Sequence, residues 1–440
     1  MLMASKTREE LERWEVSRER TFILFCFFLG LIGMEYSIVV PTLLTYLRDV
    51  IKVEHEAFWF GFIQASYSIF AMVGNFTITK YTDRTRNIKE YFYVGFFVAS
   101  LGNFLYTIPY SVVYPLVGRS MQGLGDALQS VVFGEVLRIY PEKQAVKKMS
   151  YLVSFYYVTF LIGPAFSLIF SKVDTLFFGI QLTIVNVPTL VIAFLWFICI
   201  PLNWFFMKNL SKEYDMKEEM RLGGMLSDED PDSNQHDELT FQRLVSFKEI
   251  RIILSINFLC TYAAVANYDT ALPFVCATYY KMKVQTIALL FSATGIVFLL
   301  TLVFVLSKIN LQNNEIYVII VGLTIFIIAM QSMALSALLS HLRYIGLSFL
   351  ALYTITNGTS WSLEQVLLGV TVGKMILSRH QSYVEGVRRA LSSFGRITGG
   401  FLTPVLHNYL VEQLNIFSSI LFLIVIYLFV GDLKFTVLRI

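Results

Sequence analysis

The chain has 440 residues, of which 56% are hydrophobic and only 15% are charged, and its formal net charge is +3. A soluble domain carries about 25% charged residues, so this composition argues against an ordinary soluble enzyme or binding domain.

Long uncharged runs account for the missing charge. Val185–Phe206, Thr286–Ser307 and Phe417–Gly431 contain no Asp, Glu, Lys or Arg. A helix needs about 20 apolar residues to cross a bilayer. The sequence therefore predicts an all-α polytopic membrane protein with twelve spans, at 22–46, 58–79, 91–109, 112–139, 149–170, 185–207, 250–278, 286–307, 315–339, 346–373, 384–409 and 417–437.

The predicted spans divide into two six-helix bundles, 21–207 and 250–440, after a cytosolic N-terminal segment, 1–20. A polar stretch, 208–249, joins the bundles and contains the acidic run Ser-Asp-Glu-Asp-Pro-Asp at 227–232. Such a composition favours a flexible cytosolic linker. A phosphorylation or trafficking role for this linker is the alternative. The second bundle ends in a short cytosolic tail.

The distribution of positive charge predicts the orientation. With an even number of spans and a cytosolic N-terminus, 27 of the 35 Lys and Arg residues fall on the cytosolic side. That bias is the one that the positive-inside rule requires, and an odd number of spans would destroy it. Both termini are therefore expected in the cytosol.

The two halves also resemble each other. The first span contains Tyr36 and Pro41, and the seventh contains Tyr268 and Pro273, so both carry Tyr-x4-Pro at the corresponding place. Together with the central linker, this match predicts two parallel repeats, an architecture in which transporters place their binding site between the halves.

The loop between the second and third spans carries a charged motif, Thr-Lys-Tyr-Thr-Asp-Arg-Thr-Arg at 79–86. Asp83 and Arg84 can bind neighbouring helix ends and so hold one conformation. Arg84 and Arg86 can equally serve only to fix the topology. We name Asp83, Arg84 and Arg86 as a candidate gating motif.

The fourth span carries a longer motif, Arg-Ser-Met-Gln-Gly-Leu-Gly-Asp-Ala at 119–127. Arg119, Gln122 and Asp126 share one face of a helix, but about 10 Å of rise separates Arg119 from Asp126. Each is expected to find a partner elsewhere or to face a common cavity. The glycines permit close helix packing, which is reason enough for their presence.

These motifs, with Gly163-Pro164 in the fifth span, resemble the signatures of the major facilitator superfamily. Residues 119–127 match its helix-4 signature, Arg-x-x-Gln-Gly-x-Gly-x-Ala, completely. The loop departs from Gly-x3-Asp-Arg-x-Gly-x-Arg at both glycines, and the helix-5 motif lacks its flanking glycines. The resemblance implies two six-helix bundles around a central cavity lined by helices 1, 4, 7 and 10, with helix 11 in a supporting place.

Three stretches carry a narrower resemblance within that superfamily. Residues 36–47 and 61–73, and Gly395-Arg-Ile-Thr-Gly-Gly in the eleventh span, are similar to the lysosomal family of the major facilitator superfamily domain-containing protein eight. That resemblance implies an endolysosomal membrane and a role in the flux of chloride or of an organic solute.

Six ionisable side chains fall inside predicted spans. A charge at the centre of a membrane helix costs about 2.5–3.5 kcal/mol on insertion scales, so pairing, protonation or a watery cavity must offset it. The four acids outnumber the two bases, which favours protonation of at least one acid and hence coupling to protons. Ion pairs that only fix packing are the structural alternative. These residues are Glu35, Arg119, Asp126, Asp269, Glu364 and Arg396.

We predict a secondary transporter that alternates access to a site at the midplane. An anion channel and a non-transporting scaffold that acts through 208–249 are the alternatives. The candidate substrate-binding or coupling residues are the six charged side chains with Gln122 and the tyrosines beside the acids, Tyr36 and Tyr268.

No catalytic motif emerges. The sequence has no Gly-rich phosphate loop with Lys-Ser/Thr and no His-Glu-x-x-His zinc motif. We therefore expect no enzyme activity, no cofactor and no metal. The expected partners are a small-molecule or ion substrate and the lipid bilayer, with no nucleic acid, and the expected state is a monomer.

Overall fold

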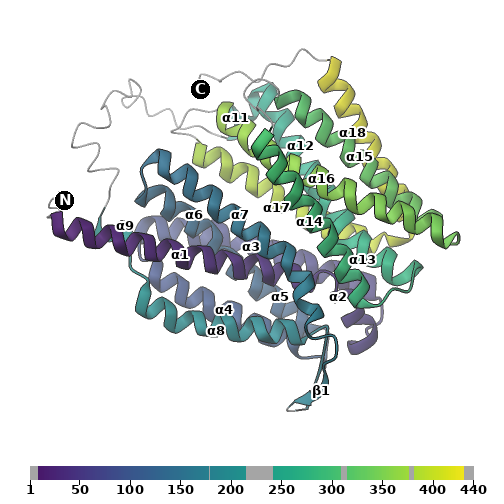
Figure 1. The fold of residues 1–440 in the computed structure, drawn as a ribbon, viewed down its shortest axis with the longest axis horizontal. Coiled ribbons are helices and arrows are strands. Elements are labelled where there is room, and N and C mark those ends of the chain that lie inside the picture. The colour runs from purple at the N-terminus through teal and green to yellow at the C-terminus, as the bar shows by residue number, and fades with distance from the viewer. Residues whose placement is uncertain (1–7, 178, 215–240, 309–314, 376–380, 431–440) are drawn as a thin grey trace.

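The computed structural model describes residues 8–177, 179–214, 241–308, 315–375 and 381–430, and Figure 1 shows it as a bundle of long helices. Six spans form the N-terminal half. Apolar residues dominate each span, and charged or turn-forming residues separate them. The spans are α1 (Arg8–Val39), α3 (Glu56–Thr85), α4 (Ile88–Thr107), α5 with α6 (Val113–Asp126 and Leu128–Ile139), α7 (Glu142–Leu168) and α8 (Val187–Phe206).

Six further spans form the C-terminal half, after the short helix α11 (Phe241–Ser246). Its first span is irregular, because α12 (Lys248–Ala264) continues as the π-helix η2 (Val265–Ala271), one turn of α13 (Leu272–Phe274) and a second π-helix, η3 (Val275–Tyr279). The other spans are α14 (Val284–Lys308), α15 (Glu315–Leu338), α16 (Arg343–Met375), α17 (Gln381–Val405) and α18 (Leu410–Val430), with the 3-10 turn η5 (His407–Tyr409) before the last.

The first span of each half ends in the same irregular way. Pro41 has no N–H to continue a helix, and beyond it come α2 (Leu43–Thr45) and the π-helix η1 (Tyr46–Ile51). Pro273 lies before η3 in the same manner. Each π-helix stops near a lysine in the left-handed region, Lys52 with φ of 59° and Lys281 with φ of 50°. This shared distortion supports an internal repeat.

The most extensive packing between the two halves is in two pairs of helices, α3 with α17 and α7 with α14. Both contacts depend on small residues, because a Cβ on Gly61 would lie 2.9 Å from the Phe401 carbonyl oxygen and one on Gly295 would lie 2.7 Å from Leu161. Within the halves, α1 packs on α7, α4 on α8, and α15 on α16 and α18.

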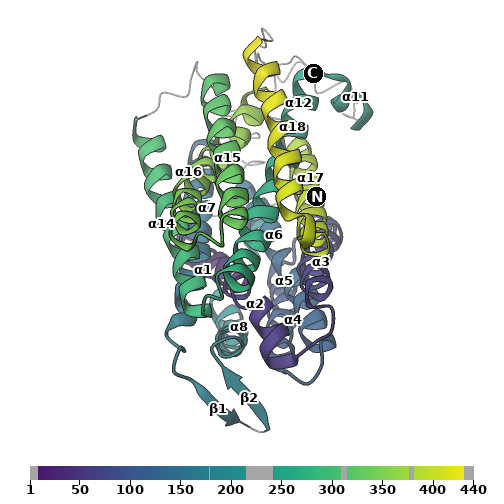
Figure 2. The ribbon, with the colours of Figure 1, turned by 90° about the vertical axis from the view of Figure 1, so that its right-hand side faces the viewer.

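One strand pair occurs in the described residues, and the sequence did not predict it. The strands β1 (Asp174–Phe177) and β2 (Ile180–Thr183) pair antiparallel, with Asp174 opposite Thr183, in the connection between α7 and α8. Figure 2 shows this hairpin projecting from one end of the molecule, opposite the end that carries α11. We call these two ends the hairpin side and the linker side.

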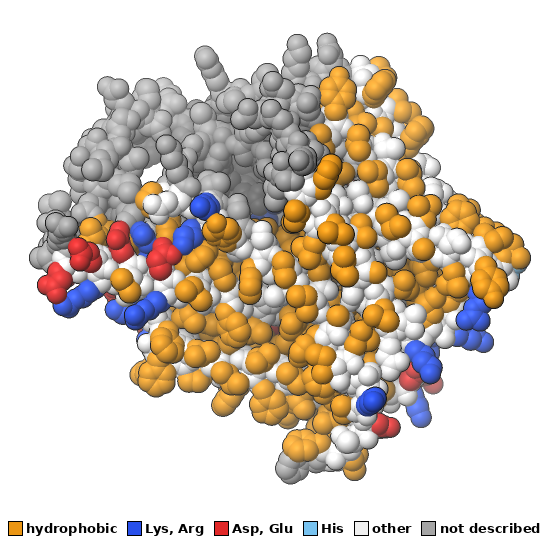
Figure 3. All heavy atoms as spheres, viewed as in Figure 1, with side chains coloured by type: hydrophobic (Ala, Val, Ile, Leu, Met, Phe, Trp, Pro, Cys, Tyr) orange, Lys and Arg blue, Asp and Glu red, His pale blue; other side chains and the backbone are white. Residues whose placement is uncertain are grey.

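The outer surface is apolar between those two ends. Figure 3 shows hydrophobic side chains across the face in view, with charged side chains gathered towards its margins. Phe197, Leu300 and Leu423 are each more than 60% exposed on three different helices. So large an apolar surface suits a bilayer rather than water. Within the described ranges, eight helices have the length and composition of a membrane span; α4, the broken α5–α6, α16 and α17 are shorter or more polar.

The beginning of the predicted linker is packed against the N-terminal half. After α8, residues Asn209–Tyr214, which we call the docked segment, contain the short helix α9 (Leu210–Glu213). Leu210 and Ser211 are buried, and the Trp14 indole donates to the Leu210 carbonyl at 3.3 Å. The end of the linker forms α11, and residues 215–240 lie outside the described residues.

Candidate functional site

Arg119 lies at the centre of the N-terminal half, on α5, with no exposed surface. Its Nη1 donates to Gln122 Oε1 at 2.8 Å, and its Nη2 donates to Gln64 Oε1 on α3 at 3.3 Å. Its guanidinium also lies over two aromatic rings, 4.4 Å from the centre of Tyr67 and 5.3 Å from that of Tyr36. A guanidinium is always protonated in proteins. The two amides and two tyrosine rings that contact Arg119 are uncharged, so none of these contacts neutralises its charge.

Tyr36 connects the two halves. It lies one residue after Glu35 on α1, and its hydroxyl donates to Asp269 Oδ2 on η2 at 2.6 Å. Its ring packs on Phe160 of α7, with the ring centres 5.7 Å apart. Because the same side chain covers Arg119 and binds Asp269, a movement of either half relative to the other must disturb it.

Asp269 owes its position to the π-helix. A π-helix adds a residue per turn and so changes which side chains face a neighbour. On η2, Asp269 turns towards Tyr36 of the other half, whereas Tyr268 turns back and donates to the Phe291 carbonyl of α14 at 3.1 Å. Both side chains are buried. Of the two candidate site residues on η2, Tyr268 and Asp269, only Asp269 bonds to the partner half.

Glu35 lies inside the N-terminal half and belongs to a continuous chain of hydrogen bonds. Its Oε1 accepts from Asn103 of α4 at 3.0 Å, and its Oε2 accepts from the Trp196 indole of α8 at 2.6 Å. Gln122 Nε2 in turn donates to Asn103 Oδ1 at 2.9 Å and so joins this group to Arg119. Glu35 thus reaches Arg119 through two amides and not by direct contact.

Asp126 and Arg396 approach the same cluster from opposite halves. Asp126, buried on α5, lies beside the Tyr67 hydroxyl and within electrostatic range of Arg396. Arg396, half-buried on α17, donates to Ser393 Oγ at 3.1 Å and lies within electrostatic range of Tyr36. The eleventh span, α17, therefore contributes to the group that also contains Arg119 and Asp269.

A family match over most of the chain identifies the family. The profile of the Major Facilitator Superfamily matches residues 23–400. The chain belongs to the major facilitator superfamily. It is therefore a multi-pass membrane protein and a secondary transporter of a small molecule, not an enzyme.

Solved structures with this fold cover nearly the whole chain. A crystal structure of the nucleoside transporter NupG matches with a TM-score of 0.67 and 14% identity, over 94% of this chain and 99% of that one. A D-xylose-proton symporter matches with 0.66 and 13%, over 95% and 99%. A bacterial homolog of the human lysosomal transporter Spinster, in an inward-facing and occupied conformation, matches with 0.65 and 11%, over 94% and 96%.

These likenesses confirm the predicted all-α fold of twelve helices in two bundles. At such low identity they carry the fold alone. No curated protein sequence matches the chain significantly. The narrower resemblance to the lysosomal family is therefore not shown, and the organelle, the substrate and the coupling ion belong to the proposals below.

Two predicted groups lie apart from the central cluster. Glu364, on α16, is buried against Cys260 of α12 inside the C-terminal half. Arg86, at the end of the candidate gating motif, donates to the Ser211 carbonyl of the docked segment at 3.2 Å. The side chains of Asp83 and Arg84 lie outside the described residues, so the gating role of the motif stays a prediction.

Several members of the cluster are not indicated by the sequence motifs. Gln64 binds Arg119 and Asn103 binds Glu35, but neither is ionisable and neither is next to a charged residue in the sequence. Trp196 and Trp361 were also missed. A polar amide or an indole inside an apolar span, where its N–H needs a partner, is the signal that would have found all four.

The two halves close together on the hairpin side. Val39, Phe60 and Phe274 belong to one buried apolar cluster that crosses between the halves. At its edge, Arg48 donates from Nε to Glu56 Oε2 at 2.8 Å and from Nη2 to the Thr278 hydroxyl at 3.4 Å. The bond with Glu56 raises the pKa of Arg48 above its ordinary value. This contact ties η1 to α3 and η3.

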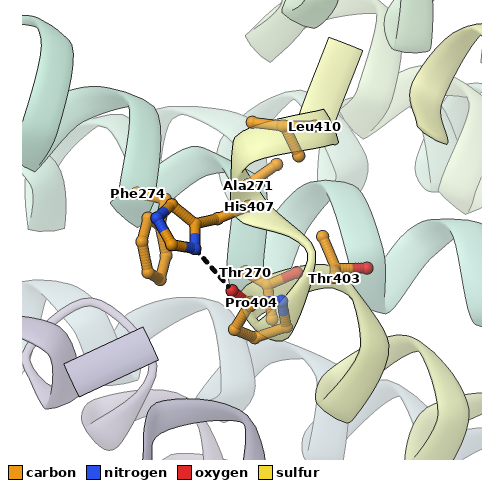
Figure 4. Close-up of a pocket in the computed structure, with 7 residues that line it drawn as sticks. All are labelled: Thr270, Ala271, Phe274, Thr403, Pro404, His407 and Leu410. Carbon is orange, nitrogen blue, oxygen red and sulfur yellow. Dashed lines mark hydrogen bonds between the residues drawn. The ribbon is translucent and has the colours of Figure 1, made fainter. Parts of the chain in front are cut away.

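A small cleft on the hairpin side is separate from the charged cluster. Figure 4 shows its lining, which comes from η2, α13, α17, η5 and the start of α18 and includes Thr270, Phe274, Thr403 and His407. The His407 ring lies 5.4 Å from that of Phe274, and its Nδ1 is 3.0 Å from the Pro404 carbonyl oxygen. Because its lining contains no carboxylate or guanidinium, we do not assign the solute to this cleft.

Proposed function

We propose that the chain moves its solute by alternating access and couples that movement to protons through Asp269. The observation that carries the proposal is the hydrogen bond from Tyr36 to Asp269, which joins the first spans of the two halves directly beside Arg119. A contact in this place must break or rearrange when the halves rock.

Protonation of Asp269 supplies the switch. A hydroxyl bound to a carboxylate forms a charge-assisted bond, roughly twice as strong as one between neutral groups. A proton on Asp269 removes that charge and weakens the bond to Tyr36, so the halves separate more easily. Arg396 lies within electrostatic range of both Asp269 and Asp126, so it responds to the same change of charge.

The remaining candidates have different roles in this proposal. Arg119, with Gln122 and Tyr36, contacts the solute, and Glu35 holds this group in place from the N-terminal half. Tyr268 and Glu364 support the packing of the C-terminal half, where their contacts lie. Asp83, Arg84 and Arg86 hold the linker side, and Arg86 does so through Ser211. The protein works as a monomer and without a cofactor.

We place the protein in an endolysosomal membrane with the linker side in the cytosol. The positive-inside distribution of Lys and Arg supports that orientation, and the hairpin side then faces the lumen. The resemblance of residues 36–47, 61–73 and 395–400 to a lysosomal family supports the organelle. Tagged protein in fractionated cells, compared with markers for each membrane, tests it.

The transport experiment uses purified protein in liposomes with an imposed pH gradient. Sugars, nucleosides, amino acids and organic acids are offered in turn. We expect one class to enter saturably and to follow the gradient. Asp269→Asn should keep exchange of that solute but lose its dependence on the gradient, and Tyr36→Phe should weaken the dependence.

Tyr344→Phe is the matched control, because Tyr344 is 87% exposed on the hairpin side and should leave uptake unchanged. The proposal fails if no solute moves, and the coupling role fails if Asp269→Asn follows the pH gradient as the native protein does.

The anion channel is the second candidate, because Arg119 and Arg396 place two positive charges in the centre of the span. It predicts currents that rise linearly with voltage in recordings from the organelle, with selectivity changed by substitution of either arginine. A transporter saturates instead and shows trans-stimulation.

A scaffold that acts through the linker is the third candidate, and the docked segment is the observation that favours it. It predicts that deletion of 215–240 abolishes function, whereas Asp269→Asn has no effect.

A further inference from the structure

Two guanidiniums in the central cluster each keep a buried donor atom without a hydrogen bond. Nε of Arg119 and Nε of Arg396 both lack a partner among the described residues. Neither side chain forms a salt bridge with the described acids, and both lie within electrostatic range of Tyr36 and Asp269. A buried, unsatisfied donor on a charged group is costly, so such an atom marks a place where an acceptor fits.

Two acids of the same cluster are already engaged. Glu35 accepts from Asn103 and Trp196, and Asp269 accepts from Tyr36. Among the described residues of this cluster, the buried polar atoms that lack a hydrogen bond are all N–H donors, Gln64 Nε2 included. That asymmetry fits an anion and not a cation.

An aromatic wall adjoins these donors. Phe160 stacks on Tyr36 and also meets the Trp361 ring edge-on, with the centres 5.5 Å apart. Trp361, half-buried on α16, in turn contacts Tyr268 and Phe298 of the C-terminal half. These rings come from both halves, and flat apolar surfaces of this kind suit an aromatic or apolar molecule.

We propose that the site takes an organic anion, with its carboxylate or phosphate on Arg119 and Arg396 and its apolar body against Trp361. A guanidinium presents paired N–H groups in the geometry of a carboxylate or phosphate. In this structure Tyr36 covers Arg119, so the anion reaches Arg119 when the Tyr36–Asp269 bond opens. The inference rests on the proposed function, because it names the solute class of the same site.

Binding is measured first, separately from transport, through the fluorescence of purified protein. The probes are phenylpropionate, phenyl phosphate, the neutral phenylpropionamide, the cationic phenethylamine and sodium chloride. We expect saturable quenching by phenylpropionate or phenyl phosphate, and the stronger of the two decides between carboxylate and phosphate. The amide and the amine should bind at least about 10-fold more weakly, because a hydrogen bond to a charged group contributes about 1.5–3 kcal/mol.

Four variants test the geometry. Arg396→Gln and Arg119→Gln should each weaken the anion about 10- to 100-fold, and Arg119→Lys should recover only part of the loss because it keeps the charge without the fork. Trp361→Phe should remove the quenching signal. Arg13→Gln is the control: its guanidinium is 76% exposed on the first turns of α1, paired with Glu9, and far along the chain from the site.

Three results would each overturn the inference: the amide binds as tightly as phenylpropionate, the amine binds more tightly than phenylpropionate, or sodium chloride quenches saturably while neither organic anion does. If the folded Arg396→Gln protein, with its native elution profile, binds the anion as the native protein does, the assigned contact is wrong, even if Arg119→Gln fails to fold. Saturable transport of a sugar that phenylpropionate does not inhibit refutes the anion and leaves the transporter standing. Anion binding without any transport refutes the proposed function and leaves this site standing.

Discussion

Replacement of Glu35 by glutamine tests the direction of the hydrogen-bond chain in the N-terminal half. Arg119 and Trp196 are donors only, and they stand at the two ends of the chain. The bonds therefore run from Arg119 through Gln122 and Asn103 to Glu35 and from Trp196 to Glu35. Each carboxylate oxygen of Glu35 accepts one hydrogen bond, so both incoming N–H donors are satisfied when the carboxyl group is deprotonated.

A glutamine in that place has one acceptor oxygen and one amide that only donates. One of the two incoming donors must then face another donor, inside a cluster with almost no exposed surface. An unsatisfied buried polar group costs about 1–3 kcal/mol, and we expect a loss of that size.

Thermal unfolding of detergent-purified protein measures this loss. For a cooperative unit of about 200 residues, the size of one half, 1 kcal/mol corresponds to about 2–4 °C, so Glu35→Gln should lower Tm by about 2–12 °C. A double-mutant cycle with Trp196→Phe isolates the contact. The second substitution should cost at least about 1 kcal/mol less in the Glu35→Gln background than in the native one.

An unchanged Tm for Glu35→Gln would refute the double-acceptor role. So would equal effects of Trp196→Phe in both backgrounds, because they would show that the indole gains nothing from the carboxylate.

Three further predictions concern packing and the two ends of the molecule. Gly123→Ala places a Cβ 2.2 Å from the Tyr67 carbonyl oxygen and should lower the free energy of unfolding by at least about 1–3 kcal/mol. The control Gly134→Ala, whose Cβ would meet nothing within 4 Å, should be neutral or slightly stabilising. Equal effects of the two substitutions on thermal unfolding would contradict the packing of α5 on α3. Leu210→Ala should make the docked segment sensitive to a protease while the bundle keeps its Tm, and an unchanged cleavage pattern would count against the docking. Arg48→Gln should raise the labelling of a cysteine placed at the hairpin-side seal by a few-fold, since a part-exposed ion pair contributes at most about 1 kcal/mol; unchanged labelling would show that the apolar cluster alone closes this side.

The helices were predictable because their cause is local. An apolar run of about 20 residues folds as a helix in a bilayer whatever surrounds it, since every backbone N–H must be bonded within the segment. The helix-4 motif was also readable, because Gly123 is needed where α5 meets the backbone of α3. The family match then confirmed the fold that these features predicted.

The partners of the buried charges were not predictable in the same way. Glu35 and Asp269 look alike in the sequence, each beside a tyrosine in the first span of a half. Their surroundings differ because η2 is a π-helix, which turns Asp269 towards the other half, while Glu35 points to α4 and α8. The repeat pattern gives no sign of such a difference in helical phase. The β-hairpin was missed for a related reason, because four-residue strands carry too short a pattern.

The docked segment changes where the linker is mechanically attached. The connecting chain stays packed on the N-terminal half beyond the end of α8, at least as far as Tyr214, whose ring centre lies 5.0 Å from that of Trp14. Before that point, Ser211 is clasped by Glu135 at the end of α6 and by Arg86 at the end of α3. A force exerted by a partner bound farther along the linker would therefore be distributed over the ends of α1, α3 and α6. It would act on the N-terminal half as a whole and not on α8 alone.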